Sequence, residues 1–148
     1  METSTEKSKE LTASIILLNQ KLLFEGQVAG NEPVYIDYVP PLGDNLGYTS
    51  LELLLLSLSS CVGSALLVVL RKMQKTILTF GIAATGQRKL EHPTGFKSIQ
   101  LEVNVQSPDI TDDMLGNAIA RLEGLCPVLD MVKGNVEIKY SFKITQSL

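Results

Sequence analysis

The sequence predicts a single soluble α+β domain. Segments with the alternating or β-branched composition of strands lie on both sides of one long apolar helix, and two shorter helices precede the last strand. A length of 148 residues is typical of one domain, and a hydrophobic fraction of 45% is enough for one core. We therefore expect a polar, disordered N-terminus over residues 1–10 and one domain over residues 11–148.

The first third of the domain is typical of an antiparallel meander. Residues 14–18 and 22–28 suit extended structure, and Val34, Ile36 and Tyr38 form an apolar face with polar Asp37 between them. Residues 39–48 are crowded with Pro, Gly, Asp and Asn, which predicts a loop that leads into the central helix.

The central helix is expected to begin at a capping box. Thr49 and Glu52 have the spacing at which hydroxyl and carboxylate satisfy the first free amides of a helix reciprocally. No charged residue occurs from Leu53 to Leu70, and the cations Arg71 and Lys72 follow, where they complement the helix dipole.

Two environments are compatible with so apolar a helix. A membrane span fits its length and the flanking cations, and would make the chain a membrane-anchored interaction protein. Small polar residues, among them Ser57, Ser60 and Ser64, make the middle of this helix less apolar than a typical membrane span. The amphipathic strands elsewhere in the chain also need an apolar element to cover them. We therefore expect a helix buried in a soluble fold, with no membrane partner.

The remaining elements follow in order along the chain. A strand is expected from Ile77 to Thr85, followed by the turn EHPTG and a strand with one wet face. Thr111 can cap a second helix that runs to Glu123, and a last strand ends at Ile144. The predicted elements after the turn are strand 99–105, helices 112–123 and 127–132, and strand 136–144.

Composition and motifs exclude several classes of function. The net charge is −3 and the basic residues are scattered, so nucleic acid is not an expected partner. There is no export signal, which places the chain in the reducing cytoplasm. Nucleotide-binding glycine motifs and hydrolase motifs are missing, and one histidine with two distant cysteines does not favour zinc, so no cofactor and no metal are expected.

Cys61 and Cys126 are the candidate catalytic residues. Cys61 lies in the middle of the apolar helix, where a cysteine can simply pack as a small hydrophobe. With Ser57 and Ser64 it forms a narrow stripe of small side chains that admits either a second helix or a substrate. Cys126 precedes Pro127 at the N-cap of the third helix, which favours a thiolate, although an ordinary cap is the alternative.

Three segments in order, with both cysteines in place, resemble the OsmC/Ohr family of osmotically inducible and organic hydroperoxide resistance proteins. They are TSLELLLLSLSSCVGSALLVVL, GQRKLEHPTGFKSIQLEV and LCPVLDMVKGNVEIKYSF. The resemblance implies antiparallel sheets around a long buried central helix that carries Cys61. It also implies an intertwined homodimer with active sites at the subunit interface.

The same resemblance implies an antioxidant oxidoreductase of the oxidative stress response. The residue matching Cys61 attacks an organic hydroperoxide, and the one matching Cys126 resolves the sulfenic acid as a disulfide. A dithiol such as lipoamide then reduces the enzyme. Disulfide formation requires the fold to bring Cys126 onto the flank of the central helix.

Two positions depart from the family pattern. Its peroxidases hold the attacking thiolate with an arginine from the N-terminal strands, whereas Arg71 is the first arginine here and Lys21 is the nearest basic substitute. Without a cation, burial should raise the pKa of Cys61. The family's catalytic glutamate corresponds to Leu51, one position before Glu52. Both departures resemble the branch of proteins described as YhfA-like.

Glu52 thus has two interpretations, a helix cap or a catalytic carboxylate. It lies about 13.5 Å along the axis from Cys61 and on the opposite side of the same helix, so a catalytic role would require the partner subunit. Two functions also stay open for the whole chain. One is a thiol-dependent peroxidase, and the other is a non-enzymatic member that binds a small molecule or senses redox state.

Overall fold

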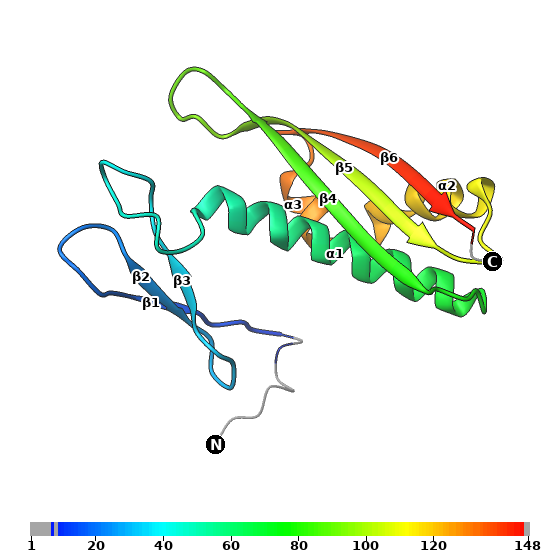
Figure 1. Ribbon diagram of the computed structural model, residues 1–148, viewed down its shortest axis with the longest axis horizontal. Coiled ribbons are helices and arrows are strands. Elements are labelled where there is room, and N and C mark those ends of the chain that lie inside the picture. Colours follow the sequence, from blue (N-terminus) through cyan, green and yellow to red (C-terminus); the bar gives the residue numbers. More distant parts are fainter. Residues whose placement is uncertain (1–6, 8, 147–148) are drawn as a thin grey trace. The chain divides into compact units, whose positions relative to one another are not determined.

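The computed structural model describes residue 7 and residues 9–146. Its elements are β1 (Ser14–Leu17), β2 (Phe24–Gln27), β3 (Val34–Ile36), α1 (Ser50–Lys72), β4 (Thr79–Arg88), β5 (Phe96–Gln106), α2 (Asp112–Ala120), the 3₁₀ turn η2 (Leu122–Gly124), α3 (Pro127–Val132) and β6 (Glu137–Thr145). Figure 1 shows the two three-stranded sheets and the long helix. The α+β class is confirmed.

The chain forms two compact units, Met1–Leu53 and Leu54–Leu148. The predicted single domain over residues 11–148 therefore stays a prediction, and most of the predicted disordered N-terminus lies outside the described residues.

The first unit is the predicted antiparallel meander. β2 pairs with both neighbours, so that Phe24 lies opposite Leu17 on one side and Ile36 on the other. The strands are short and leave much of their apolar surface open, since Ile15 is 58% exposed and Leu17 is 51% exposed. This unit therefore has little core of its own.

Asp37 corrects one sequence expectation. The alternation of apolar and polar residues predicted that Asp37 faces solvent, but the residue is only 3% exposed. Its carboxylate accepts hydrogen bonds from the backbone N–H groups of Tyr38, Asp44 and Leu46, at 2.7 to 3.2 Å. Burial alone would raise the pKa of Asp37, but these three donors outweigh it and lower that pKa. The buried carboxylate thus organises the predicted loop.

The second unit contains a mixed sheet in the order β4-β5-β6. β4 and β5 are antiparallel, with Phe80 opposite Val105, whereas β5 and β6 are parallel. The expectation of antiparallel sheets is therefore wrong for this last pair. The physical reason is the connection, because the segment that carries α2, η2 and α3 returns the chain to the end of the sheet where β5 starts.

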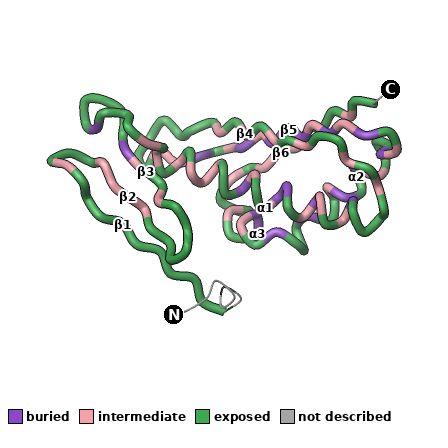
Figure 2. The backbone as a smooth tube through the Cα atoms, turned by 60° about the horizontal axis from the view of Figure 1, so that its bottom comes forward, coloured by how far each residue is buried: buried purple, intermediate pink, exposed green. Residues whose placement is uncertain are grey.

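One face of this sheet is apolar and the other is polar. Ile99, Leu101 and Val103 of β5 are fully buried, and their partners in β6 include Tyr140. The alternate residues of β5 and β6, such as Glu102 and Lys139, face the other way and are exposed. In Figure 2 the three helices lie together on one side of the sheet, where they cover the apolar face.

Helix α1 begins with the predicted capping box. The Thr49 hydroxyl accepts a hydrogen bond from the Glu52 N–H at 3.2 Å, and Glu52 Oε1 accepts one from the Thr49 N–H at 2.9 Å. These two bonds satisfy amides that the helix itself leaves free. The start of α1 is therefore determined by residues that are close together in the sequence.

Within this chain, one side of α1 is buried. Leu58, Val62, Leu66 and Leu70 recur every fourth residue and are 0% exposed. Gly63 lies on the same side, where a Cβ would come within 3.3 Å of the Phe80 ring in β4. The missing side chain lets α1 pack closely against the sheet.

By length and composition α1 is also capable of crossing a membrane, as core helices of soluble proteins are. A third of its most apolar stretch, 33%, is buried within the chain. Its packing against β4 accounts for that buried face without a bilayer.

The elements that follow β5 agree closely with the sequence. The Thr111 hydroxyl accepts from the Met114 N–H at 3.2 Å and caps α2. That helix ends at Ala120 rather than Glu123, because the chain tightens there into the 3₁₀ turn. Helix α3 has the predicted bounds, and Gly134 beyond it adopts a left-handed φ of 92°.

Candidate active site

The fold brings together the two cysteines, which are far apart in the sequence. Cys61 is in the middle of α1, and Cys126 is the N-cap of α3. The two thiols are free, and they are near enough for Cys61 to raise the pKa of Cys126. The two cysteines that the family resemblance pairs are therefore near each other in the fold.

Cys126 is the buried member of the pair, with 2% of its surface exposed. Its Sγ accepts a hydrogen bond from the Leu129 N–H at 3.4 Å, so it caps α3 as predicted. Burial and the hydrogen bond with Cys61 nevertheless raise the pKa of Cys126 to about 11. The expectation that the helix N-terminus makes Cys126 a thiolate is wrong, because desolvation outweighs the cap.

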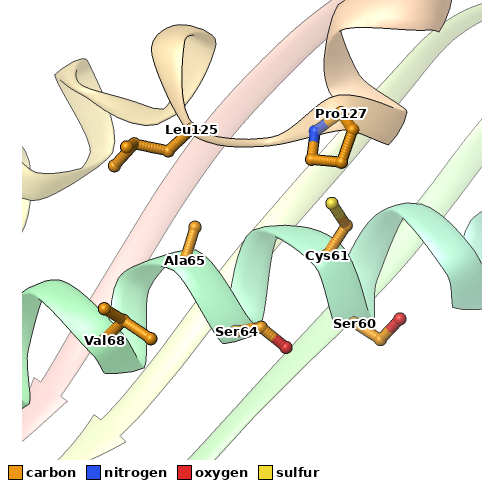
Figure 3. A pocket seen from close by; sticks show the side chains of 7 residues that line it. All are labelled: Ser60, Cys61, Ser64, Ala65, Val68, Leu125 and Pro127. Carbon is orange, nitrogen blue, oxygen red and sulfur yellow. The ribbon is translucent and has the colours of Figure 1, made fainter. Parts of the chain in front are cut away.

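Cys61 is only half-buried and lines a pocket of about 390 Å³. Ser60, Ser64, Ala65 and Val68 of α1 form one side of the pocket, and Leu125 and Pro127 form the other. Figure 3 shows the sulfur of Cys61 pointing from α1 toward Pro127, whereas the two serine hydroxyls point away from α3. A small molecule in this pocket would therefore meet Cys61 before Cys126.

Tyr140 is near enough to Cys126 for the charge of that thiol to affect its pKa, which sequence reasoning missed. It lies on the apolar face of β6, and burial, with smaller contributions from the charges of Cys126 and Glu123, raises the pKa of its phenol. Apolar residues, Tyr140 among them, alternate with polar ones in the predicted strand 136–144, which predicts that Tyr140 faces inward. Nothing in the sequence indicated that α3 would bring Cys126 close to it.

Glu52 is placed in the capping box and not beside the thiols. It is exposed, and its Oε1 accepts hydrogen bonds from both the N–H and the hydroxyl of Thr49. These bonds lower the pKa of Glu52. The structure therefore accounts for Glu52 as a cap, and its catalytic role stays a prediction.

Lys21, the basic residue that the sequence offered as a substitute for the arginine, has a carboxylate partner. Lys21 Nζ lies 2.7 Å from an Asp44 carboxylate oxygen. Arg88 donates to the Thr94 carbonyl at 2.6 Å in the turn between β4 and β5. Within the described residues, no lysine or arginine lines the pocket at Cys61.

The chain was compared with protein families and with known proteins. A model described as OsmC-like protein matches residues 43–141, which is more than half of the sequence. The chain belongs to the OsmC-like protein family. The search of curated proteins gave no match.

Solved structures of this OsmC-like protein's relatives share its fold. A hypothetical protein from Aquifex aeolicus is 22% identical, with a TM-score of 0.82 over 95% of this chain and 99% of that one. An OsmC-like protein from Mycoplasma pneumoniae is 18% identical, with a TM-score of 0.80 over 93% and 99% of the two chains. An organic hydroperoxide resistance protein from Elizabethkingia anophelis is 18% identical, with a TM-score of 0.70 over 96% and 99%.

Proposed function

We propose that this OsmC-like protein is a thiol-dependent peroxidase that reduces organic hydroperoxides through Cys61 and Cys126, as an antioxidant enzyme of the YhfA-like branch. The observation that carries the proposal is a free Cys61 thiol that lines an apolar pocket, with the free and buried Cys126 thiol near it. A peroxidase needs one accessible sulfur for the oxidant and a second within reach to capture the product.

The difference in burial assigns the roles of the two thiols. Cys61 lines the pocket, so its thiolate would attack the terminal oxygen of the hydroperoxide. The O–O bond breaks, the alcohol leaves with one proton, and Cys61 becomes a sulfenic acid. Cys126, which is buried, then attacks that sulfur, the S–S bond forms, and the hydroxyl leaves as water with the Cys126 proton.

A dithiol such as lipoamide would complete the cycle. Two external sulfhydryls become a disulfide, and both protein thiols are regenerated. The sum is reduction of one hydroperoxide to alcohol and water at the expense of one dithiol. We place this reaction in the cytoplasm, where reductants keep such thiols free.

We further propose that the chain acts as an intertwined homodimer. Support comes from apolar surface that a single chain leaves uncovered, including Ile15 and Leu17 of β1 and Leu56 of α1, each 51–58% exposed. A second subunit would also be the source of any catalytic action by Glu52, because helix geometry keeps that carboxylate from the thiol of its own helix.

The test is a mass and free-thiol count before and after one equivalent of cumene hydroperoxide, with Cys61→Ser and Cys126→Ser alongside. We expect loss of both thiols to one Cys61–Cys126 disulfide, reversed by dihydrolipoamide. Cys126→Ser should stop at a sulfenic acid on Cys61, while Cys61→Ser should keep its thiol. Two unreactive thiols in folded protein would rule out the peroxidase.

A non-enzymatic member is the second candidate, in which the pocket binds a small apolar molecule or the thiols sense redox state. The observations that favour it are the raised pKa of Cys126 and a pocket lining without lysine or arginine in the described chain. It predicts that cumene hydroperoxide is not consumed in the presence of excess dithiol, whereas the peroxidase predicts continuous turnover.

A further inference from the structure

The first unit contains a second hollow, about 590 Å³ in volume, beside β1 and β2. It is lined by residues 12–14, which lead into β1, by Glu25 and Gln27 of β2, and by four residues of the loop between β2 and β3. It shares no lining residue with the pocket at Cys61. Its volume is in the range of small-molecule sites, roughly 300–1,000 Å³.

A tight turn builds the loop side of this hollow. The Asn31 N–H donates a hydrogen bond to the Val28 carbonyl at 3.1 Å, and Gly30 between them has a φ of 84°. A type II turn requires a positive φ at its third residue, which glycine adopts without strain. Pro33 follows with a fixed φ just before β3 begins. The shape of the loop is therefore determined by its own sequence.

The hollow is on the face of the first sheet that the proposed homodimer leaves free. Ser14 lies opposite Gln27 in the pairing of β1 with β2, so both side chains are on one face, and Glu25 is on that face too. Ile15 and Leu17 alternate with these residues and point to the other face. A second subunit that covers the apolar face would therefore leave the hollow accessible.

The lining combines one charge with several hydrogen-bonding groups. Glu25 is partly buried, and in the part of the chain that the structure describes it forms no ion pair. Thr12 and Ser14 contribute hydroxyls, and Gln27 and Asn31 contribute amides. No lysine or arginine lines the hollow within the described residues. Since a carboxylate accepts its strongest hydrogen bonds from cationic donors, a ligand would have to supply the cation.

We propose that this hollow is a binding site for a small organic ammonium ion that also carries hydroxyl groups, such as an amino sugar. The ammonium group would pair with the Glu25 carboxylate, and the hydroxyls would exchange hydrogen bonds with Ser14 and Asn31. Val28, which is 37% exposed, and Pro33 would contact the apolar side of the ligand. An anion would be repelled by the same carboxylate.

Glu32 provides a matched control for Glu25. It is an exposed residue of the same loop and does not line the hollow. Glu25→Gln and Glu32→Gln each remove one negative charge and keep the shape of the side chain. Glucosamine and glucose form a matched pair of probes, because an ammonium group in one replaces a hydroxyl in the other.

The experiment records amide spectra of the isotope-labelled full chain at mildly acidic pH, while each probe is added. Glucosamine should shift the amide signals of residues 25–31 saturably, and glucose should bind about tenfold more weakly. Glu25→Gln should lower the affinity for glucosamine about tenfold and leave that for glucose unchanged. Glu32→Gln should change neither affinity by more than about twofold, because salt screens an exposed charge outside the hollow.

These spectra separate a binding site from general attraction between opposite charges. Equal losses of affinity in Glu25→Gln and Glu32→Gln would overturn the proposal, as would equal affinities of the wild type for glucose and glucosamine. The absence of any saturable shift at residues 25–31 would also overturn it. The same spectra report the fold of each variant, so a loss of binding with the other signals unchanged cannot come from unfolding.

Discussion

The raised pKa of Cys126 predicts how the stability of the protein depends on alkaline pH. The pKa is about 11 in the folded chain against an ordinary value of 9.0, chiefly because the thiol is buried. The folded state therefore favours the neutral thiol. This stabilisation is fully present below pH 9, and it is lost as the pH rises from 9 through 11, because the unfolded chain ionises first.

The size of the effect follows from the two pKa values. Integration of the proton linkage between pH 8 and pH 11 gives a loss of about 2 kcal/mol in the free energy of unfolding from this one thiol. Cys126→Ser removes the titrating group and retains a side chain that caps helices well. Its stability should therefore decline less than that of the wild type over the same interval.

The assay is urea denaturation of both proteins at several pH values from 8 to 11, with a phosphine reductant present. Tyr140, whose pKa is also raised, adds its own alkaline loss in both proteins, so the difference between them reports Cys126 together with its effect on Tyr140. Because Cys61 helps to raise this pKa, Cys61→Ser should lower the pKa of Cys126 and reduce its contribution. Parallel stability curves for the wild type and Cys126→Ser would refute the reasoning.

Three further predictions concern residues other than the two cysteines. Glu52→Ala should lower the free energy of unfolding by about 1 kcal/mol through loss of the cap, whereas Glu52→Gln should retain most of the stabilisation by the cap. If Glu52→Gln is stable but its peroxidase rate falls strongly, the carboxylate is catalytic. Gly63→Val should destabilise by about 1–3 kcal/mol in denaturant titrations, because the added side chain meets Phe80, and wild-type stability would contradict the packing. Because its pKa is lowered in the folded chain, the Asp37 carboxylate should stabilise the protein at pH values above its ordinary pKa of 3.8, and this contribution should be lost as the pH falls. The free energy of unfolding of Asp37→Asn should therefore depend less on acid pH than that of the wild type. An unchanged acid dependence would contradict the hydrogen-bonded, buried carboxylate.

Local signals in the sequence predicted most of the secondary structure. The Thr49 and Glu52 pair gave the start of α1, and Pro127 and Gly134 bracket α3 as capping preferences require. Asp37 was misplaced because strand periodicity cannot distinguish an exposed carboxylate from one that backbone amides surround. Partners of this kind are determined by the loop conformation, which periodicity does not encode.

The positions of the two cysteines relative to each other could not be predicted from local sequence patterns. Spacing placed Cys61 on the central helix and Cys126 on a cap, but their proximity came from the family resemblance and depends on the tertiary fold. The pKa of Cys126 was predicted in the wrong direction because the sequence shows a helix N-terminus and not the burial around it. Tyr140 was missed for the same reason, since its inward orientation was predictable and its neighbours were not.

The parallel pairing of β5 and β6 has a consequence for the order of events in a newly made chain. In the sequence, the segment that carries Cys126 lies after β5 and before β6. Contacts between distant parts of a chain form late, after the entropy of closing long loops has been offset. Cys61 precedes all of these elements in the chain, so it is synthesised before Cys126. We therefore expect the two thiols to come together late in folding, when β6 joins the sheet and fixes the position of the segment before it.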